Sequence, residues 1–207
     1  CSSPASSQLK PLHRVVQARL REPYSGKHAH PTQALLDLFT MRRHLGALDG
    51  KKVVIVGDVL HSRVARSNVW SLLAAGANVT LCGPATLLPR TLASAGGEEG
   101  RVALTADLDR ALVDADVVMA LRIQKERQAT GLIPSLREYI NGYQVNAMRL
   151  ARAKPGALVM HPGPMNEGIE IAADIAHGID SVIEEQVANG VAVRMAVLYL
   201  MATARTK

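Results

Sequence analysis

The spacing of apolar residues switches repeatedly between a helical period and short continuous runs. From residue 31 to 45 apolar side chains recur every three or four positions. Pro31 suits a first helical turn and Gly46 marks a stop, so the spacing predicts a helix. Residues 53–56 are an uninterrupted β-branched run, which is typical of a strand buried on both faces. The regular part of the chain therefore begins with a helix followed by a strand.

The same criteria predict four more strands, which alternate with helices. The strands cover residues 79–82, 102–104, 117–121 and 157–160. The helices cover residues 63–75, 107–113, 134–139, 144–152 and about 180–201. This order favours an α/β fold in which flanking helices cover a doubly wound, parallel sheet of about five strands, Rossmann-like in architecture.

Two segments stand apart from this order. Residues 1–27 are rich in Ser and Pro and then basic, so we treat them as an unassigned remnant beside one α/β domain over residues 28–207. Residues 67–89 carry no charge and are long enough to be considered as a membrane span. Their Asn, Gly and Pro residues instead favour a buried helix, a turn and a strand, so no membrane partner is expected.

Composition narrows the class of partner. Apolar residues make up 48% of the 207 residues and aromatic residues only 3%, so Ala, Val and Leu must fill the core. Lys and Arg number 24 against 18 Asp and Glu, a net charge of +6 without a lysine-rich block. Small anions are therefore a better expectation than nucleic acid or lipid. Cys1 and Cys82 form no disulfide framework, which favours a reduced, cytoplasmic setting.

Polar clusters follow three of the predicted strands and precede the first helix. They occupy residues 28–33, 57–68, 122–127 and 161–165. Parallel strands present their carboxyl ends at one edge of the sheet, and ligands bind at that edge in doubly wound folds. We expect these clusters to converge on one crevice.

Two arginines in these clusters, Arg63 and Arg122, are candidates for anion binding. An arginine after a strand is often an ordinary surface residue. Arg63, however, opens a helix, where the helix dipole disfavours a cation unless an anion is bound nearby. Because a guanidinium group matches a carboxylate bidentately, two arginines at this edge could clamp a dicarboxylate.

The other candidates suit a carbonyl or an amide. His30 and Gln33 are three residues apart on one helix face and could hold a carbonyl together, although His30 could equally be a helix cap. Pro162, Gly163 and Pro164 could form a rigid turn, or could present backbone carbonyls to an amino group. We also expect the Gly163–Pro164 peptide to be cis, because this proline-flanked loop needs an unusual turn.

Two other kinds of chemistry are weakly supported. Asp58, His61 and Ser62 are the residue types of a hydrolytic triad, but their closeness in sequence argues against that geometry. His28, His30 and His61 have no carboxylate or thiol at metal-ligand spacing, so no zinc site is expected.

Four motifs, in order from about residue 26 to 201, resemble the catalytic chains of aspartate carbamoyltransferases. They are the segments His30–Asp37, Gly57–Asn68, Arg122–Arg127 and His161–Pro164. Thr32 separates the chain from the ornithine-using relatives, which carry Cys in the His-Pro-x-Gln motif. The ornithine-using relatives also place a cysteine in the loop that starts here at His161.

The resemblance implies transfer of the carbamoyl group from carbamoyl phosphate to the amino group of L-aspartate, early in de novo pyrimidine biosynthesis. The catalytic residue that donates to the carbamoyl oxygen would be His30. Carbamoyl phosphate would be bound by His30, Gln33, Pro162, Gly163 and Pro164. Aspartate would be bound by Arg63, Arg122 and Gln124. The resemblance implies no organic cofactor and no metal, and a homotrimer that can associate with regulatory or other pathway subunits.

The chain also departs from the family's pattern. The Ser-Thr-Arg-Thr phosphate clamp of the family's carbamoyl-phosphate domain does not occur in the sequence. The chain therefore resembles the aspartate-binding half with the two helices that connect the domains. A truncated, catalytically incomplete binding or assembly module of the same fold is an alternative function. A nucleotide-binding Rossmann oxidoreductase is a weaker alternative, because Gly57 is not followed by the other glycines of the G-x-G-x-x-G motif.

The last predicted helix is apolar almost all round over residues 191–201. A helix of this kind must be buried on more than one side to be stable. In the family it packs on the first domain. We therefore expect part of this face, and of the Leu35 and Leu38 face of the first helix, to meet water in this chain.

Overall fold

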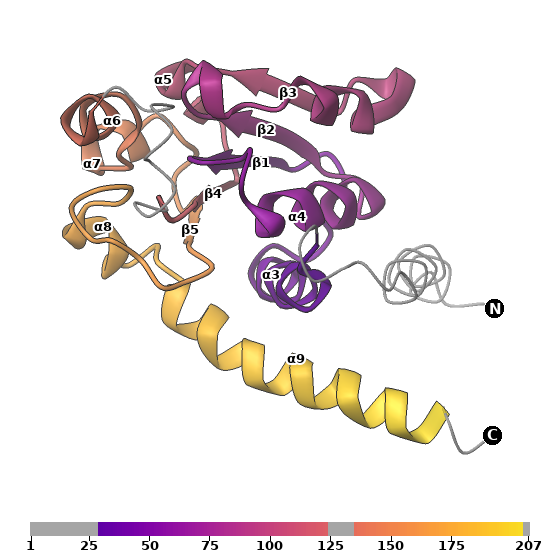
Figure 1. Ribbon diagram of the computed structural model, residues 1–207. Helices are drawn as coiled ribbons and strands as arrows, with labels where there is room; N and C mark the ends of the chain where they lie inside the picture. Colours follow the sequence, from indigo (N-terminus) through magenta and orange to yellow (C-terminus); the bar gives the residue numbers. More distant parts are fainter. Residues whose placement is uncertain (1–28, 124–134, 205–207) are drawn as a thin grey trace.

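Five parallel strands form one sheet, in the order β3-β2-β1-β4-β5, in the computed structural model, which describes residues 29–123 and 135–204 (Figure 1). The strands are β1 (Lys52–Val56), β2 (Asn78–Cys82), β3 (Val102–Thr105), β4 (Val117–Ala120) and β5 (Leu158–Met160). In the central strand, Val53 is paired with Val79 and with Val117. The predicted doubly wound α/β sheet of about five strands is confirmed.

Helices connect the strands and cover both faces of the sheet. The longer α-helices are α3 (Pro31–Leu45), α4 (Arg63–Ala74), α6 (Leu136–Tyr143) and α9 (Ile183–Ala204). The shorter α-helices are α5 (Leu108–Leu112), α7 (Ala147–Leu150) and α8 (Ala173–Ala176). Two 3₁₀ segments, η1 (Ala85–Leu87) and η2 (Arg90–Glu99), follow β2.

The sheet separates two apolar cores, because alternate residues of a strand point to opposite faces. Val53 and Ile55 of β1 pack with Leu72 of α4 and with apolar residues of α3. Val54 and Val56 pack on the other face with residues of α5. All four of these β1 residues are buried, which explains why the strand appears in the sequence as an unbroken apolar run.

The observed elements refine several predicted boundaries. The helix expected over residues 144–152 shrinks to α7, because Asn146 caps it and Val145 is held in a bridge with Ile171. The last helix begins at Ile183 rather than near residue 180. The segments η1, η2 and α8 were not predicted, and the expected boundary between residues 27 and 28 lies outside the described residues.

The uncharged stretch from residue 67 to 89 contains most of α4 and then β2, as predicted, followed by η1. No helix within residues 29–123 and 135–204 has the length and apolar character needed to cross a bilayer.

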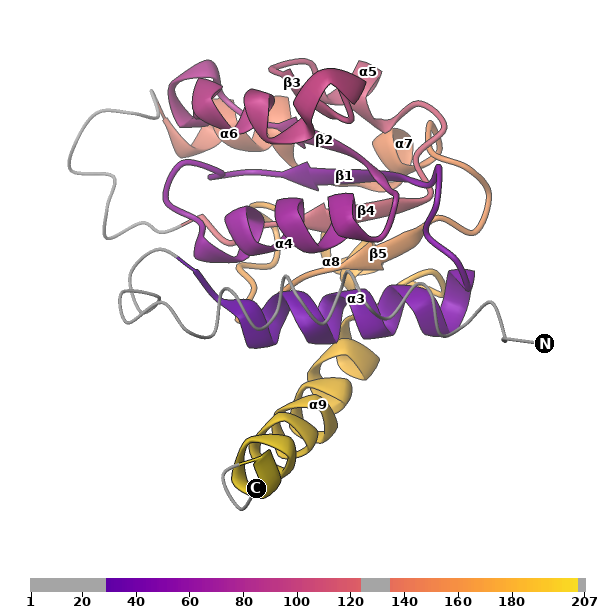
Figure 2. The same cartoon turned by 90° about the vertical axis from the view of Figure 1, so that its right-hand side faces the viewer.

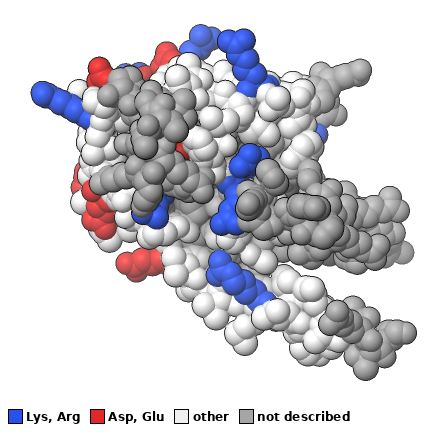
Figure 3. Space-filling view, in the orientation of Figure 1, with Lys and Arg blue, Asp and Glu red and all other residues white. Residues whose placement is uncertain are grey.

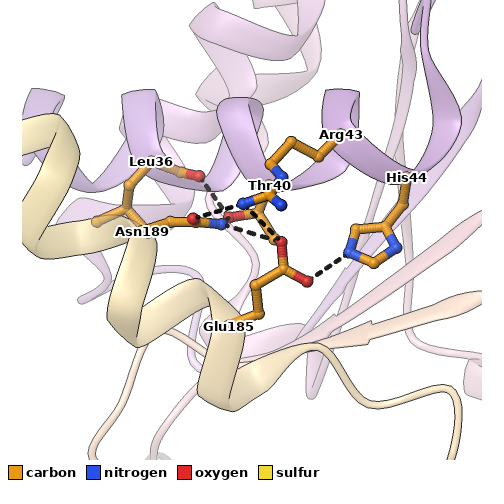
Figure 4. Close-up of polar contacts among 6 residues, drawn as sticks. All are labelled: Leu36, Thr40, Arg43, His44, Glu185 and Asn189. Atoms are coloured by element: carbon orange, nitrogen blue, oxygen red, sulfur yellow. Dashed lines mark hydrogen bonds and ion pairs between the residues drawn. The ribbon is translucent and has the colours of Figure 1, made fainter.

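Helix α9 is joined to α3 by polar contacts at its first turns, as Figure 4 shows. Asn189 Nδ2 donates to Thr40 Oγ1 over 3.0 Å, and Thr40 Oγ1 donates to the Leu36 carbonyl over 2.8 Å. Near the other end of the contact, His44 Nε2 lies 2.7 Å from a carboxylate oxygen of Glu185. These bonds fix the angle at which α9 leaves the body of the protein.

Beyond these contacts α9 projects away from the sheet (Figure 2). Its outer turns expose large apolar side chains, including Val191, Met195 and Leu198 at 61%, 65% and 67%. The expected exposure of this helix is therefore confirmed. The same expectation is wrong for Leu38, which is 2% exposed because it belongs to the core on the α3 and α4 side of the sheet. Leu35 is half-buried.

We predict that the exposed face of α9 makes the isolated chain associate, because each large side chain left in water forgoes roughly 1.5–3 kcal/mol of burial. Sedimentation velocity at micromolar concentration should show oligomers, and Leu198→Lys should shift the distribution towards monomer. Ile179→Lys is the matched control, since Ile179 is fully exposed elsewhere. A wild-type chain that stays monomeric with a sharp, high melting transition would contradict this prediction.

Candidate functional site

The carboxyl ends of the central strands converge where the sequence places its polar clusters. β1 continues into Gly57, and the neighbouring β4 continues into Leu121 and Arg122. A Cβ atom on Gly57 would lie 3.0 Å from the Leu121 carbonyl oxygen, and Gly57 has φ +129°, so a glycine is required there. This close approach lets the loops after β1 and β4 start side by side.

His30 caps the N-terminus of α3 and is anchored to α4. Its backbone N–H donates to Ser67 Oγ over 2.8 Å. Its ring Nδ1 accepts from the backbone N–H of Gln33 over 3.3 Å, and Thr32 Oγ1 lies 3.4 Å from the same nitrogen. The side chain is thus the helix cap that the sequence allowed, and its ring orientation is fixed.

This cap determines which ring nitrogen of His30 carries a proton. The Gln33 N–H donates to the His30 carbonyl over 3.1 Å and to Nδ1 over 3.3 Å, and the second bond favours the neutral tautomer that carries its hydrogen on Nε2. Burial, together with the positive charges of Arg63 and Arg194, lowers the pKa of His30. At neutral pH the residue is therefore an uncharged donor through Nε2.

Gln33, one turn into α3, is nearly buried and is held at both ends of its amide. Its Nε2 donates to Asp37 Oδ1 over 2.9 Å. Its Oε1 accepts from Arg194 Nη2 of α9 at the longer distance of 3.5 Å. The amide nitrogen is thus engaged inside the protein, and the amide oxygen faces Arg194.

A cavity of about 110 Å³ opens between α3, α9 and the loop after β5. It is lined by Gln33, Leu36, His161, Pro162, Gln186, Val187, Gly190 and Arg194. Two candidates from different parts of the sequence, Gln33 and Pro162, therefore share one cavity. A Cβ on Gly190 would lie 2.8 Å from Arg194 Nη1, so this glycine leaves room for the guanidinium to fold back towards the cavity.

The loop after β5 is held by a buried polar cluster. His161 Nδ1 accepts from the Gly163 N–H over 2.9 Å, and His161 Nε2 lies 3.2 Å from Glu170 Oε1. Asn166 Nδ2 joins the same carboxylate and also donates to the Ile123 carbonyl, which links this loop to the one after β4. The Gly163–Pro164 peptide is cis, as predicted.

The two candidate arginines follow neighbouring strands. Arg63 is the first residue of α4 and is exposed, and its positive charge is one cause of the lowered pKa of His30, after burial. Arg122 is half-buried after β4, which is paired with β1. Gln124 lies outside the described residues. Basic side chains appear on the body and on α9, facing the gap between them (Figure 3).

The structure places Asp58, His61 and Ser62 in structural roles. His61 Nδ1 lies 3.0 Å from both carboxylate oxygens of Asp58, and the His61 backbone N–H also donates to Asp58. Ser62 Oγ instead caps α4 by accepting from the Ala65 N–H over 3.1 Å. Within the described parts of the chain, no group of three His, Cys, Asp or Glu side chains is placed to hold a metal ion.

Sequence reasoning missed three residues that the structure brings to the site: Asp37, Gln186 and Arg194. Asp37 is fully buried, although its motif shows only one acidic residue in an apolar helix. Arg194 interrupts an otherwise apolar stretch of α9, and that isolated charge was the available signal. Gln186 carried no signal, because nothing local distinguishes a buried glutamine from an exposed one.

Comparison with known proteins assigns the family. Residues 49–201 match the model of the aspartate/ornithine carbamoyltransferase Asp/Orn binding domain. The chain belongs to the aspartate/ornithine carbamoyltransferase family. An aspartate carbamoyltransferase catalytic subunit from Roseiflexus sp. (strain RS-1) is 61% identical over 84% of the chain and 54% of its own length. The corresponding subunit from Gluconobacter oxydans is 58% identical over 94% of the chain and 61% of its own length.

Solved structures of the family share the fold. Ornithine carbamoyltransferase from Pyrococcus furiosus matches with a TM-score of 0.74 and 29% identity, over 83% of this chain and 56% of that one. Aspartate transcarbamoylase from Trypanosoma cruzi in complex with carbamoyl phosphate matches with a TM-score of 0.72 and 28% identity, over 84% and 56%. The chain thus spans a little over half the length of the relatives it matches.

We predict that Asp37 makes the protein less stable as pH rises from about 4 to about 6. Burial raises the pKa of Asp37 to about 6, while three amide donors and Arg194 oppose this shift. Between those pH values the unfolded chain releases the proton that the folded chain retains, which disfavours folding by on the order of 3 kcal/mol once the pH exceeds 6.

Denaturant unfolding of wild type and of Asp37→Asn at pH 4, 5, 6 and 7 measures this effect. The difference in free energy of unfolding between wild type and the variant should fall as pH rises through this window and then level off. A difference that is independent of pH would show that Asp37 ionises as readily in the folded as in the unfolded chain.

Proposed function

We propose that this chain carries the aspartate-binding half of an aspartate carbamoyltransferase and contributes to transfer of the carbamoyl group from carbamoyl phosphate to L-aspartate. The observation that carries the proposal is the convergence of Gln33 and Pro162 on one cavity. The backbone N–H of Gln33 is in turn bound by the ring of His30. A carbamoyl group needs this combination, because its oxygen accepts a hydrogen bond while its NH₂ group donates two.

In the proposed reaction the α-amino nitrogen of aspartate attacks the carbamoyl carbon. A C–N bond forms, the C–O bond to phosphate breaks, phosphate leaves with the bonding electrons, and the amine releases a proton to the departing phosphate. His30 Nε2–H donates to the carbamoyl oxygen as negative charge develops there, which is the usual stabilisation in acyl transfer. Because the charge on Arg63 and Arg194 favours the neutral ring, His30 acts as a hydrogen-bond donor and needs no proton transfer of its own.

The carbamoyl NH₂ group donates to Gln33 Oε1 and to backbone carbonyls of the loop that holds Pro162, Gly163 and Pro164. Arg63 and Arg122 bind the aspartate carboxylates, and Gln124 assists. Positioning of the two substrates supplies much of the rate gain, and no cofactor or metal takes part. The charge of these arginines, and the names of the relatives that are 52–61% identical, favour aspartate over the cationic ornithine.

The proposal extends to the setting of the reaction, early in pyrimidine biosynthesis, in a cytoplasmic homotrimer. The reduced, buried Cys82 is compatible with the cytoplasm.

A second candidate is a binding or assembly module without turnover. Calorimetry with N-carbamoyl-L-aspartate, combined with an assay of its formation from carbamoyl phosphate and aspartate, separates the two candidates. Binding with turnover supports the enzyme, binding without turnover supports the module, and failure to bind rejects both.

We predict that Arg63→Ala and Arg122→Ala each weaken succinate binding by more than tenfold, because each removes a charge-assisted pair with a carboxylate. Arg110→Ala is the matched control, since Arg110 lies on the remote helix α5. Calorimetric titration of the three variants measures the effect. An unchanged succinate affinity for either site variant removes that arginine from the proposed clamp.

A further inference from the structure

The Asp37 carboxylate joins three helices through three amide donors. Gln33 Nε2 donates to Oδ1 over 2.9 Å, and Gln186 Nε2 of α9 donates to the same oxygen over 2.6 Å. Asn68 Nδ2 of α4 donates to Oδ2 over 2.7 Å. All four side chains are at least nine-tenths buried. An ionised carboxylate accepts hydrogen bonds and cannot donate them, so it determines that the NH₂ end of each amide points towards it.

Two of these three amide side chains, those of Gln33 and Gln186, also line the cavity. The nitrogen of Gln33 is held by Asp37, and its oxygen accepts only the long 3.5 Å contact from Arg194. The second lone pair of this oxygen is therefore the acceptor that Gln33 can offer to a ligand. The opposite orientation would offer an NH₂ group, which suits a carboxylate or phosphate oxygen rather than an amide nitrogen.

The amide of Gln186 extends the same control to the loop after β5. Its Oε1 accepts from the His161 backbone N–H over 3.0 Å, while its Nε2 is bound to Asp37. His161 in turn accepts from the Gly163 N–H. One buried carboxylate is therefore connected to Gln33 and, through Gln186, to the loop that carries Pro162 and Gly163.

We propose that Asp37 is the positioning residue that makes the cavity selective for a carbamoyl NH₂ group, by turning the Gln33 amide oxygen into the cavity and by anchoring the loop after β5 through Gln186. This inference rests on the proposed function and assigns to Asp37 no contact with substrate. It separates two properties of the site: the arginines select the dicarboxylate, and Asp37 selects the amide end of the ligand.

The test compares two ligands that differ in the carbamoylamino group. N-carbamoyl-L-aspartate carries this group on a dicarboxylate, and succinate is a dicarboxylate without it. The ratio of their dissociation constants isolates recognition of the carbamoyl end. Wild type should bind N-carbamoyl-L-aspartate at least tenfold more tightly than succinate. In Asp37→Ala this ratio should fall about tenfold, while the affinity for succinate stays unchanged.

Two further variants distinguish positioning from general damage. Asp37→Asn should keep most of the ratio, because the new amide oxygen can still accept from Gln33. The new NH₂ group can donate to Asn68 Oδ1, which has no partner in wild type, once the Asn68 amide rotates. Thr40→Val breaks the neighbouring α3–α9 hydrogen bond with Asn189 (Figure 4) and should lower stability without changing the ratio. The inference is overturned if Asp37→Ala keeps the wild-type ratio, or if Thr40→Val loses as much of it.

If Asp37→Ala does not fold, a reciprocal exchange tests the same inference. Gln33→Glu should abolish the preference for N-carbamoyl-L-aspartate over succinate, because two carboxylates then face each other. Adding Asp37→Asn should restore part of it, since the new NH₂ group donates to Glu at position 33 and leaves an oxygen for the cavity. A double variant no better than Gln33→Glu contradicts the inference.

If wild type binds neither ligand, the proposed function fails, but the positioning can still be decided. Amide exchange measured by ¹⁵N NMR should show protected side-chain protons on Gln33 in wild type and in Asp37→Asn. Rapid exchange of these protons in wild type would overturn the positioning role itself.

Discussion

The buried carboxylate of Asp37 is the interaction on which the arrangement of the site depends. A buried charge is costly unless hydrogen bonds replace the lost water, and here amides from α3, α4 and α9 do so. α9 lies far from α3 and α4 in the sequence, so one acceptor with three donors helps to fix how the three helices are placed. Removing the acceptor would leave three buried donors unsatisfied, which makes the arrangement stable only as a complete set.

The sheet supplies the other constraint, because it brings separate loops to one edge. The paired strands β1 and β4 are followed by the segments that carry Arg63 and Arg122, and β5 is followed by His161 and its loop. α3 adds His30 and Gln33 from outside the sheet. In the proposed reaction the strand ends would provide charge for carboxylates, and the N-terminus of α3 would provide a neutral donor and an amide oxygen.

The fold could be predicted from the sequence because its signals are local. A β-branched run such as residues 53–56 and a stop such as Gly46 each depend on few neighbours. His30, Gln33 and Pro162 were also predictable as candidates, since the polar clusters and the family motifs contain them. The roles of Asp37 and Gln186 were not, because their hydrogen bond spans 149 positions and no local pattern reports it.

The exposure of Leu38 was mispredicted for a related reason. Helical spacing shows that α3 has an apolar face, but it does not show that this face is divided between the sheet and α9. Leu38 turns to the core, whereas Phe39 is 44% exposed. To know whether an apolar residue of α3 packs on the sheet or on α9, one needs the packing angle of α9. The polar contact between Thr40 and Asn189 helps to determine that angle.

Neutron diffraction from deuterated crystals grown with N-carbamoyl-L-aspartate would test the central claim most directly, because it distinguishes amide nitrogen from amide oxygen, which X-ray data at ordinary resolution do not. The account predicts deuterons on Gln33 Nε2 pointing at Asp37, Gln33 Oε1 accepting from the carbamoyl nitrogen, and a deuteron on His30 Nε2 directed at the carbamoyl oxygen. Deuterons on the cavity side of the Gln33 amide, with its oxygen turned towards a protonated Asp37, would contradict it.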